Sequence, residues 1–422
     1  MSRIEALIAE HCPDGIEFKA IGDFGELVRG NGMPKSDFVE DGVGCIHYGQ
    51  IYTYYGVCAT ETISFVPEEK AQKLAKVDPG DLIITNTSEN IEDVCKAVAW
   101  IGDTQIVTGG HATVLKHSQN PKYLSYYLQT PRFFNEKKKL ATGTKVIDVS
   151  AKSLAKIKIP IPPLAVQEEI VKVLDAFTEL TAELTAELTA RRQQYKYYRD
   201  KLLTFSEQRA ASSEQRAASS EQRAARVKTL GEVGKFIRGT GIQKSDFTEV
   251  GVGCIHYGQI HTHYGTWTDK TKSFVSPELG ARLRKAHKGD LVIATTSEDD
   301  EAVAKAVAWL GDEDVAVSND AYIFQHTLNS KYVSYFFQTE CFQSQKKRHI
   351  TGTKVRRISG DSLSKITIPV PSPEEQERIV SILDRFDTLV NDLSCGLPAE
   401  IKARRQQYEY YRDRLLNFPE AA

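Results

Sequence analysis

The sequence predicts an α+β protein with two compact domains, two long helical regions and an internal repeat. Three observations support this fold class. Most segments occur twice at a fixed offset, and each copy contains short β-rich runs separated by glycine clusters. A helical pattern without glycine or proline extends from Leu164 to Phe205. Because the chain has 422 residues, we expect more than one domain.

The repeat has an offset of 209 residues over most of its length. KSDFVEDGVGCIHYGQIYTYYG (35–56) returns as KSDFTEVGVGCIHYGQIHTHYG (244–265), and IPIPPLAVQEEIVKVLDAF (159–177) is matched by IPVPSPEEQERIVSILDRF (368–386). RRQQYKYYRDKLLTF (191–205) returns at 404–418 with an offset of 213. The difference of four residues therefore falls between Phe177 and Arg191, where Thr-Ala-Glu-Leu is repeated.

The repeat divides the chain into five regions. Runs such as GCIHYGQIYTYYG and DLIITN predict compact α+β domains, and prolines 160, 162 and 163 fit the entry to a helix. We expect a first globular domain over 1–155, a helical spacer over 156–205, a linker over 206–228, a second globular domain over 229–364 and a C-terminal helical region over 365–422.

The first helical region predicts one helix of about 40 residues, roughly 60 Å long. Its apolar residues recur every three or four positions, and a helix of this length with an apolar seam implies a coiled-coil partner. The second copy supplies that partner, although Gly396-Leu397-Pro398 predicts a break into two pieces. The residues expected on the helix–helix and partner surface are Phe177, Leu180, Leu184, Leu188, Leu383 and Phe386.

Three SEQRAAS-type heptads (206–226) join the copies and contain no large apolar residue. A segment of this composition cannot bury much surface. Its alanines favour a partly helical, solvated spacer, and its polarity also fits a disordered linker. Both alternatives remain open from the sequence.

Composition and motifs argue against a membrane protein and against catalysis. No long apolar span or secretory signal is present, and seven cysteines without a CxxC pair indicate reduced thiols, so we expect a cytoplasmic protein. RGTGIQKSD (238–246) lacks the glycine before lysine that a Walker A loop needs, and no GxSxG, HExxH or amino-methyltransferase signature occurs. We therefore expect a chain without catalytic residues.

Metal binding is also not expected. His256, His261 and His263 suggest a ligand cluster, but the first copy keeps only His47 and has tyrosines at the other two positions. A metal site should occur in both copies of so close a repeat. Cys45 and Cys254 lie in predicted strands and fit packing.

Polar and aromatic residues that recur in both copies are candidate contacts to DNA. Gln50 has the amide needed for a bidentate contact to adenine, whereas histidine, tyrosine, lysine and hydroxyl groups suit base edges or phosphates. Lys137–Lys139 and 346–348 form matching basic runs, although a single run of this kind is more often a solvated face. The candidate residues are Lys35, Ser36, His47, Tyr48, Gln50, Tyr52, Tyr54, Thr87, Ser88, Thr144, Lys145, Lys244, Ser245, His256, Tyr257, Gln259, His261, His263, Thr296, Ser297, Thr353 and Lys354.

The helical motifs resemble a known family. TGTKV followed by IPIPPLAVQEEIVKVLDAF looks like the junction between target-recognition domain and conserved helix in specificity subunits (HsdS) of type I restriction–modification systems. TAELTAEL followed by RRQQYKYYRD is similar to the central helix of the type IC branch, and GLPAEI with RRQQYEYYRDRLL resembles its C-terminal helix. The resemblance covers the whole layout of the chain.

The resemblance implies a non-catalytic subunit that binds double-stranded DNA in the cytoplasm of a bacterium or archaeon. Two target-recognition domains, related by a pseudo-twofold axis, would each read half of a bipartite site, while the two helices pack antiparallel and dock two methyltransferase (HsdM) subunits. The resemblance places S-adenosylmethionine, ATP and Mg in partner subunits, including the translocating HsdR subunits, and no cofactor in this chain. The net charge of −2 suggests that partners supply part of the phosphate binding.

Two features of the repeat sharpen this expectation. Because 21 of 28 positions agree between 29–56 and 238–265, we expect a near-palindromic site, with differences at Tyr52/His261, Tyr54/His263, Asn86/Thr295 and His111/Asp320. One added Thr-Ala-Glu-Leu unit lengthens a helix by about 6 Å and turns it about 40° beyond a full turn. We therefore expect the tract to act as a ruler: the number of its repeats sets the length of the unspecified DNA spacer between the two half-sites. A coiled-coil scaffold for other proteins and a stand-alone DNA enzyme are the alternatives.

Overall fold

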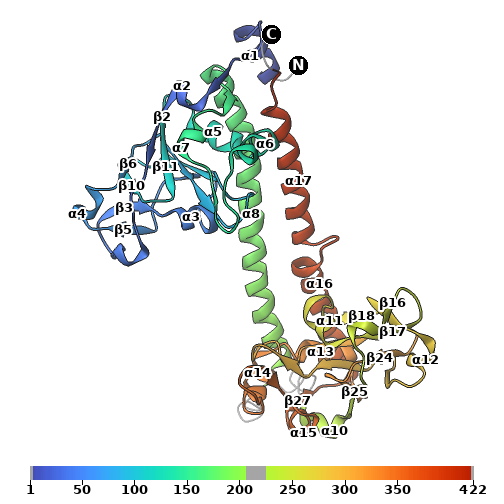
Figure 1. Cartoon of the computed structure of the whole chain (residues 1–422). Helices are drawn as coiled ribbons and strands as arrows, with labels where there is room; N and C mark the ends of the chain where they lie inside the picture. Colours follow the sequence, from blue (N-terminus) through green and yellow to red (C-terminus); the bar gives the residue numbers. More distant parts are fainter. Residues whose placement is uncertain (1–2, 206–224, 420–422) are drawn as a thin grey trace, which may run out of the picture. The chain divides into compact units, whose positions relative to one another are not determined.

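The computed structural model describes residues 3–205 and 225–419, which form two compact units (Figure 1). Unit 1 comprises Met1–Leu184 and Ile401–Ala422, and unit 2 comprises Thr185–Glu400. The chain therefore passes from unit 1 to unit 2 within one long helix and returns within another. Each unit contains one globular domain and segments of both helical regions, and the expected α+β class with two domains is confirmed.

The globular domain of unit 1 contains two β-sheets and two small strand pairs. The five-stranded sheet has the order β2 (Gly25–Arg29), β11 (Ala112–His117), β7 (Leu82–Thr85), β9 (Ala97–Trp100) and β4 (Cys58–Ala59). The four-stranded sheet has the order β5 (Ser64–Val66), β3 (Val43–Ile46), β10 (Ile106–Thr108) and β6 (Ala75–Val77). The small pairs are β1 (Phe18–Ala20) with β13 (Lys158–Pro160), and β8 (Thr87–Ser88) with β12 (Ile147–Asp148).

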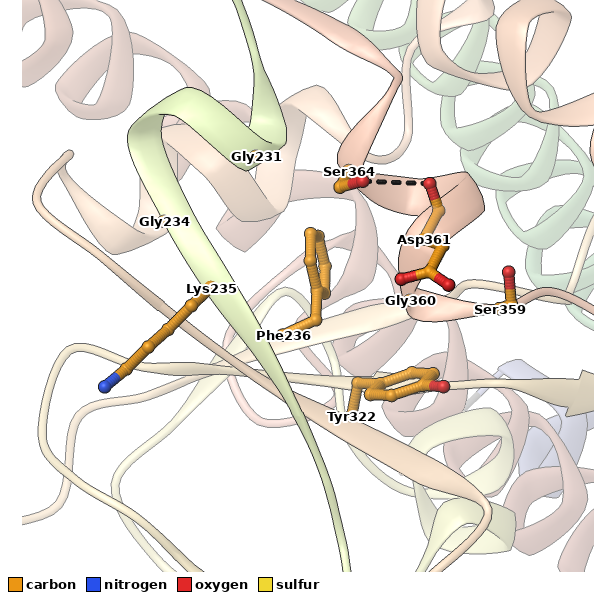
Figure 2. A pocket seen from close by; sticks show the side chains of 9 residues that line it. All are labelled: Gly231, Gly234, Lys235, Phe236, Tyr322, Ser359, Gly360, Asp361 and Ser364. Atoms are coloured by element: carbon orange, nitrogen blue, oxygen red, sulfur yellow. Dashed lines mark hydrogen bonds between the residues drawn. The ribbon is translucent and has the colours of Figure 1, made fainter.

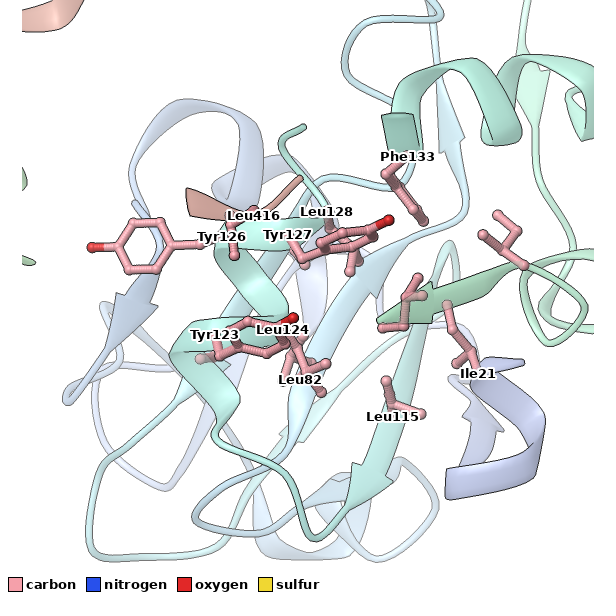
Figure 3. Packing of buried hydrophobic residues seen from close by; sticks show 14 of the residues in the cluster. Ile21, Leu82, Leu115, Tyr123, Leu124, Tyr126, Tyr127, Leu128, Phe133 and Leu416 are labelled. Atoms are coloured by element: carbon pink, nitrogen blue, oxygen red, sulfur yellow. The ribbon is translucent and has the colours of Figure 1, made fainter. Parts of the chain in front are cut away.

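Short helices connect these strands. They are α1 (Arg3–His11), α2 (Ile21–Phe24), the 3-10 helix η1 (Lys35–Asp37), α3 (Tyr48–Thr53), α4 (Glu68–Ala71), α5 (Pro121–Tyr127), α6 (Pro131–Leu140) and α7 (Ala151–Leu154). The buried core lies between the five-stranded sheet and α5, where Leu82, Leu115 and Leu124 are fully buried (Figure 3). Leu416, which follows the last helix of the chain, joins this core.

The globular domain of unit 2 repeats this arrangement. One sheet has the order β15 (Gly234–Arg238), β25 (Ala321–His326), β21 (Leu291–Ala294), β23 (Ala306–Trp309) and β18 (Trp267–Thr268). The other has the order β16 (Phe247–Thr248), β19 (Ser273–Val275), β17 (Val252–Ile255), β24 (Val315–Val317) and β20 (Lys285–Ala286). The pairs are β14 (Arg226–Thr229) with β27 (Thr367–Val370), and β22 (Thr296–Ser297) with β26 (Arg356–Arg357).

The helices of this domain are also short. They are α10 (Leu230–Val233), η4 (Lys244–Asp246), α11 (Tyr257–Thr262), α12 (Pro277–Gly280), α13 (Ser330–Phe336), α14 (Glu340–Lys347) and α15 (Gly360–Ser364). Most of the expected linker, 206–224, lies outside the described residues, so both conformations considered for it stay predictions. Strand β14 begins at Arg226, within the last residues of the expected linker.

Helix α8 (Leu164–Leu203) has 40 residues, as its uninterrupted apolar pattern predicts. The predicted break in the second helical region is also confirmed, because α16 (Pro373–Asn391) ends before Gly396 and α17 (Leu397–Leu415) begins after it. A Cβ at Gly396 would clash with the carbonyl of Thr388, so the turn needs glycine at this position.

The C-terminal part of each helical region packs in the unit of the other copy: α8 from Thr185 onward belongs to unit 2, and α17 from Ile401 onward belongs to unit 1. In unit 1 the ring of Phe177 on α8 stacks on Tyr411 of α17, with centroids 5.3 Å apart. In unit 2 the equivalent pair is Phe386 of α16 and Tyr198 of α8, at 5.8 Å. Each RRQQY segment therefore packs within the unit that contains the globular domain of the other copy. This exchange is possible because the two RRQQY segments carry the same aromatic residues.

The expectation that GCIHYGQIYTYYG is β-rich throughout was wrong for its second half. In GCIHYGQIYTYYG, β3 ends at Ile46 and α3 follows from Tyr48. The same change occurs between β17 and α11 in the second copy. A histidine cap starts each helix and overrides the strand preference of the tyrosines.

Candidate nucleic-acid interface

The polar motif at the start of α3 forms a closed hydrogen-bond arrangement. His47 Nδ1 accepts a hydrogen bond from the Gly49 amide at 3.1 Å. Gln50 Oε1 accepts from the His47 amide at 2.9 Å, and Gln50 Nε2 donates to Ser64 Oγ at 2.6 Å. Each polar atom of the Gln50 side-chain amide therefore makes one hydrogen bond within the domain.

The second copy builds the same arrangement. Gln259 Oε1 accepts from the His256 amide at 3.2 Å, and its Nε2 donates to Ser273 Oγ at 2.6 Å. A bidentate contact of Gln50 or Gln259 to adenine would have to use the second N–H of Nε2 and the second lone pair of Oε1, because these bonds already hold the amide in place. The contact stays a prediction, and the structure assigns both glutamines a capping role.

His47 is a neutral cap rather than a source of positive charge. Burial lowers the pKa of His47, and the nearby Lys35 and His111 lower it further. Burial and Lys244 lower the pKa of His256 in the same way. Neither imidazole is suited to neutralise a phosphate at neutral pH.

Residues of α3 and β8 come together at one site of unit 1. The Tyr52 hydroxyl donates to the Thr87 carbonyl at 2.6 Å, and Thr87 Oγ1 lies 2.9 Å from His111 Nδ1. The rings of Tyr48 and His111 are 5.0 Å apart. Burial raises the pKa of Tyr52 to about 12, so this hydroxyl stays protonated.

The TGTKV segments lie next to this cluster. Strand pairing places Ile147 opposite Ser88 and Asp148 opposite Thr87, which brings the preceding turn beside β8. Gly143 has φ +95° in this turn, a conformation that favours glycine. Thr144 and Lys145 at the tip are exposed, as are Thr353 and Lys354 in unit 2.

Most of the remaining candidates are exposed, but Ser88, Tyr257 and Ser297 are half-buried and Thr296 is buried. Lys35 and Ser36 lie on η1, and Lys244 and Ser245 lie on η4. Tyr54 is 64% exposed at the end of α3, and its counterpart His263 is also exposed. Tyr257 lies at the start of α11, and its amide donates to Ser318 Oγ at 2.9 Å.

The four pairs of positions expected to account for differences between the half-sites have different environments. His261 Nε2 lies 3.0 Å from the Thr296 carbonyl, so it occupies the place of the Tyr52 hydroxyl. Asn86 and Thr295 are only 2% and 7% exposed. Burial argues against direct contact of this pair with DNA, and Asn86 Nδ2 donates to the Val149 carbonyl inside the domain, so its part in half-site differences stays a prediction.

The structure adds basic residues that the sequence did not single out. Arg356 and Arg357 of β26 replace Ile147 and Asp148 and lie opposite Ser297 and Thr296. Arg356 pairs with Asp300 at 2.9 Å, whereas Arg357 is exposed. The offset of 209 residues shows that arginines replace Ile147 and Asp148, but only the strand pairing shows that they lie beside the candidate site.

The basic runs are not wholly on the surface. Lys137 and Lys346 are 4% and 0% exposed. Lys137 Nζ donates to the Glu92 and Val94 carbonyls, and Lys346 Nζ donates to those of Glu301 and Val303 at 2.9 and 2.8 Å. The first lysine of each run is therefore structural, and the other two basic residues of each run are exposed.

The helix surface residues divide between the units. Phe177 stacks on Tyr411, and Phe386 stacks on Tyr195 and Tyr198. Leu383 is fully buried and Leu188 packs against the same core of unit 2. Leu180 and Leu184 are half-buried.

Unit 2 also contains a hollow of about 410 Å³ (Figure 2). Its lining residues are Gly231, Gly234, Lys235, Phe236, Tyr322, Ser359, Gly360, Asp361 and Ser364. None of the candidate DNA-binding residues lines it. Among the described residues, no cluster of histidine, cysteine and carboxylate groups could hold a metal, and no helix is long and apolar enough to span a membrane.

Comparison with known proteins identifies relatives that match both copies of the repeat. A family model described as type I restriction modification DNA specificity domain matches residues 13–191 and 224–403. The specificity subunit of the type I restriction enzyme EcoR124I/EcoR124II from Escherichia coli is 36% identical over 311 residues, 71% of each chain. A putative type I restriction enzyme specificity subunit of Haemophilus influenzae is 32% identical over 357 residues, 80% of this chain and 82% of that one.

Two solved structures share the fold. The crystal structure of the type I restriction–modification S subunit from M. genitalium has a TM-score of 0.53 and 14% identity, covering 95% of this chain and 96% of that chain. A chain from a structure on complex assembly and conformational transition of the type I R-M system has a TM-score of 0.59 and 16% identity, covering 96% and 98%.

Proposed function

The chain belongs to the family of type I restriction–modification DNA specificity subunits, and from this premise we propose that its two domains read the halves of one near-palindromic site. It is a DNA-specificity subunit without catalytic activity of its own, and catalysis belongs to partner subunits of the complex. The scaffold alternative is not favoured, because both globular domains belong to the DNA specificity family.

The observation that carries the proposal is the recurrence, in both units, of one site with an exposed turn at its edge. In each unit, the short helix after the histidine cap touches the same small strand, and a turn with an exposed lysine lies beside it. Tyr48, Thr87 and Lys145 offer aromatic, hydroxyl and cationic groups, the kinds of side chain that contact phosphates and base edges. Two such sites on one chain suit a bipartite target.

The helices provide the spacing between the two readers. Helix α8 carries the Thr-Ala-Glu-Leu tract without a break, so each added unit shifts its far end by about 6 Å and rotates it by about 40° beyond a full turn. One base pair of B-DNA adds about 3.4 Å and roughly 35°. The rotations nearly agree, whereas the rises agree only if the helix and DNA axes are inclined to each other. The number of repeats then sets the spacer length.

The complex contains modification and restriction subunits besides DNA. We further propose that two methyltransferase subunits dock on the helices and that the assembly acts in the cytoplasm. S-adenosylmethionine, ATP and Mg are assigned to the partner subunits and none to this chain. The type IC branch stays a prediction that rests on the TAEL and RRQQY motifs.

Sequencing of modified bases tests the proposal directly. The chain is expressed with the methyltransferase subunits of its own system in a host without other adenine methylation. Methylated adenines should then occur in two inverted half-sites at one fixed separation. Two unrelated half-sites would overturn the near-palindromic prediction, and absence of any bipartite motif would overturn the DNA-reading role. Expression of either component alone is the control.

A further inference from the structure

Each recognition domain is fixed to its helix by a buried glutamine. In unit 1, Gln167 of α8 is fully buried. Its Oε1 accepts from the Asn120 amide at 2.9 Å, and its Nε2 donates to the Pro162 carbonyl at 2.7 Å. Because Asn120 caps α5, this contact joins α8 to the start of the helix that covers the sheet.

A second polar contact follows two turns later on α8. Asp175 Oδ2 accepts from Lys122 Nζ at 2.8 Å, and Asp175 Oδ1 accepts from the Tyr126 hydroxyl at 2.8 Å. Lys122 and Tyr126 lie at opposite ends of α5 and are four residues apart, so they reach the carboxylate from the same helix face. We call Asp175 with Lys122 and Tyr126 the carboxylate anchor of unit 1.

Unit 2 has the same two attachments at the repeat offset. Gln376 Oε1 accepts from the Asn329 amide at 2.9 Å, and its Nε2 donates to the Pro371 carbonyl at 2.9 Å. The carboxylate anchor of unit 2 has Asp384 accepting from Lys331 Nζ and from the Tyr335 hydroxyl, both at 2.7 Å.

The two attachments fix a direction and not only a position. Residues 167 and 175 are eight apart, which corresponds to about 12 Å along an α-helix. Ile170 and Leu174, which lie between them, and Val166 just before them are fully buried, but apolar contact is non-directional and permits small rotations. Two separated polar contacts remove that freedom, because each hydrogen bond holds only over a narrow range of distance and angle.

Neither carboxylate anchor includes any candidate DNA-binding residue. We infer that the anchors Asp175–Lys122–Tyr126 and Asp384–Lys331–Tyr335 are positioning groups that hold each recognition domain at a fixed angle to its helix and thereby restrict the DNA spacer to one length. The inference rests on the proposed function. The helix length can select one spacer only if each recognition domain cannot tilt on its helix, because one base pair rotates the half-site by roughly 35°.

The test is to map methylation with variants that break the anchors without touching the DNA site. Asp175→Ala, Asp384→Ala and the double variant are expressed with the methyltransferase subunits, and the spacer length of every methylated site is read. We expect the double variant to raise the share of sites with a spacer one base pair shorter or longer by about tenfold, whereas both half-site sequences stay unchanged.

Matched variants keep the outcome decisive. Glu168→Ala changes an exposed carboxylate of the same helix and should leave the spacer distribution as in the wild type. Asp175→Asn keeps an acceptor for the Tyr126 hydroxyl and should relax the spacer less than Asp175→Ala. Unchanged spacer selectivity in all anchor variants would overturn the inference, as would loss of all methylation in each single variant. If the wild-type chain gave no bipartite motif, the proposed function itself would fail.

Discussion

Phe177 and Tyr411 stack in unit 1 with ring centroids 5.3 Å apart and planes inclined by 19°, although they belong to different copies of the repeat. The aromatic face of the last helix therefore completes the core around the first recognition domain. Leu415 and Leu416 extend the same contact into that core. The stability of unit 1 depends on this returning segment.

Removal of this stack should destabilise the chain measurably. Offset aromatic pairs contribute about 0.5–1.5 kcal/mol beyond the area they bury. A double-mutant cycle of Phe177→Leu and Tyr411→Leu in chemical unfolding should give a coupling free energy of this size. Tyr197→Leu, which alters an exposed ring, serves as the control with little effect. Additive effects of the two leucine variants would refute the predicted coupling.

The buried lysine of α14 should give stability an alkaline dependence. Burial lowers the pKa of Lys346 from 10.5 to about 8, because desolvation disfavours its charge. Between pH 8 and about 10.5 the unfolded chain binds this proton more strongly than the folded chain, so the free energy of unfolding should rise with pH in this window. The destabilisation that comes from burying the charged lysine is complete below pH 8 and absent above about pH 10.5, where Lys346 is neutral in both states.

A variant pair isolates this contribution. Lys346→Met removes the titrating group, and Lys347→Met removes its exposed neighbour. Chemical unfolding at pH 7.5 and 9.5 should show a larger gain for wild type and Lys347→Met than for Lys346→Met, by on the order of 2 kcal/mol. Equal gains in all three proteins would show that Lys346 does not titrate in this way.

The exposed lysines of the TGTKV turns should contribute to DNA affinity without selecting bases. Lys145→Ala and Lys354→Ala each remove one cation beside the β8 or β22 strand. Each variant, assembled with the methyltransferase subunits, should weaken binding equally for matched and mismatched duplexes and reduce the slope of log affinity against log salt by about one. Lys19→Ala, in an ion pair with Glu17, is the control. An unchanged salt slope would argue against phosphate contact.

The exposed differences between the copies should account for any asymmetry of the target. Tyr54 and His111 correspond to His263 and Asp320. The double variant Tyr54→His, His111→Asp should shift the first half-site toward the sequence of the second. Asn86→Thr, a change in the buried interior, should leave the half-site unchanged. Mapping of methylated motifs distinguishes these outcomes, and a base change caused by Asn86→Thr alone would contradict this assignment.

Much of the fold could be predicted from the chain because duplication and helical periodicity leave direct traces. The start of α8 follows from the proline before Leu164, and the break near Gly396 follows from Gly-Leu-Pro. The helix ends at Leu203, slightly before Phe205, where the apolar pattern ends. The partner of each RRQQY segment could not be predicted, because the two segments are nearly identical and fit either domain.

The candidate site was predicted less completely. Tyr52, Thr87 and the TGTKV turn come together as a recurring polar set would suggest. Gln50 and Lys137 were harder to interpret, because capping and burial depend on contacts to Ser64 and to the carbonyls of Glu92 and Val94, which are distant in sequence. The anchors at Asp175 and Asp384 were missed for the same reason.

The most direct test of the ruler is the insertion of one Thr-Ala-Glu-Leu unit after Leu188. The altered chain is expressed with its methyltransferase subunits, and methylated adenines are mapped across the host genome. The account predicts that both half-sites keep their sequences while the spacer between them grows by one base pair. An unchanged spacer with efficient methylation, or a change in the half-site sequences, would contradict it.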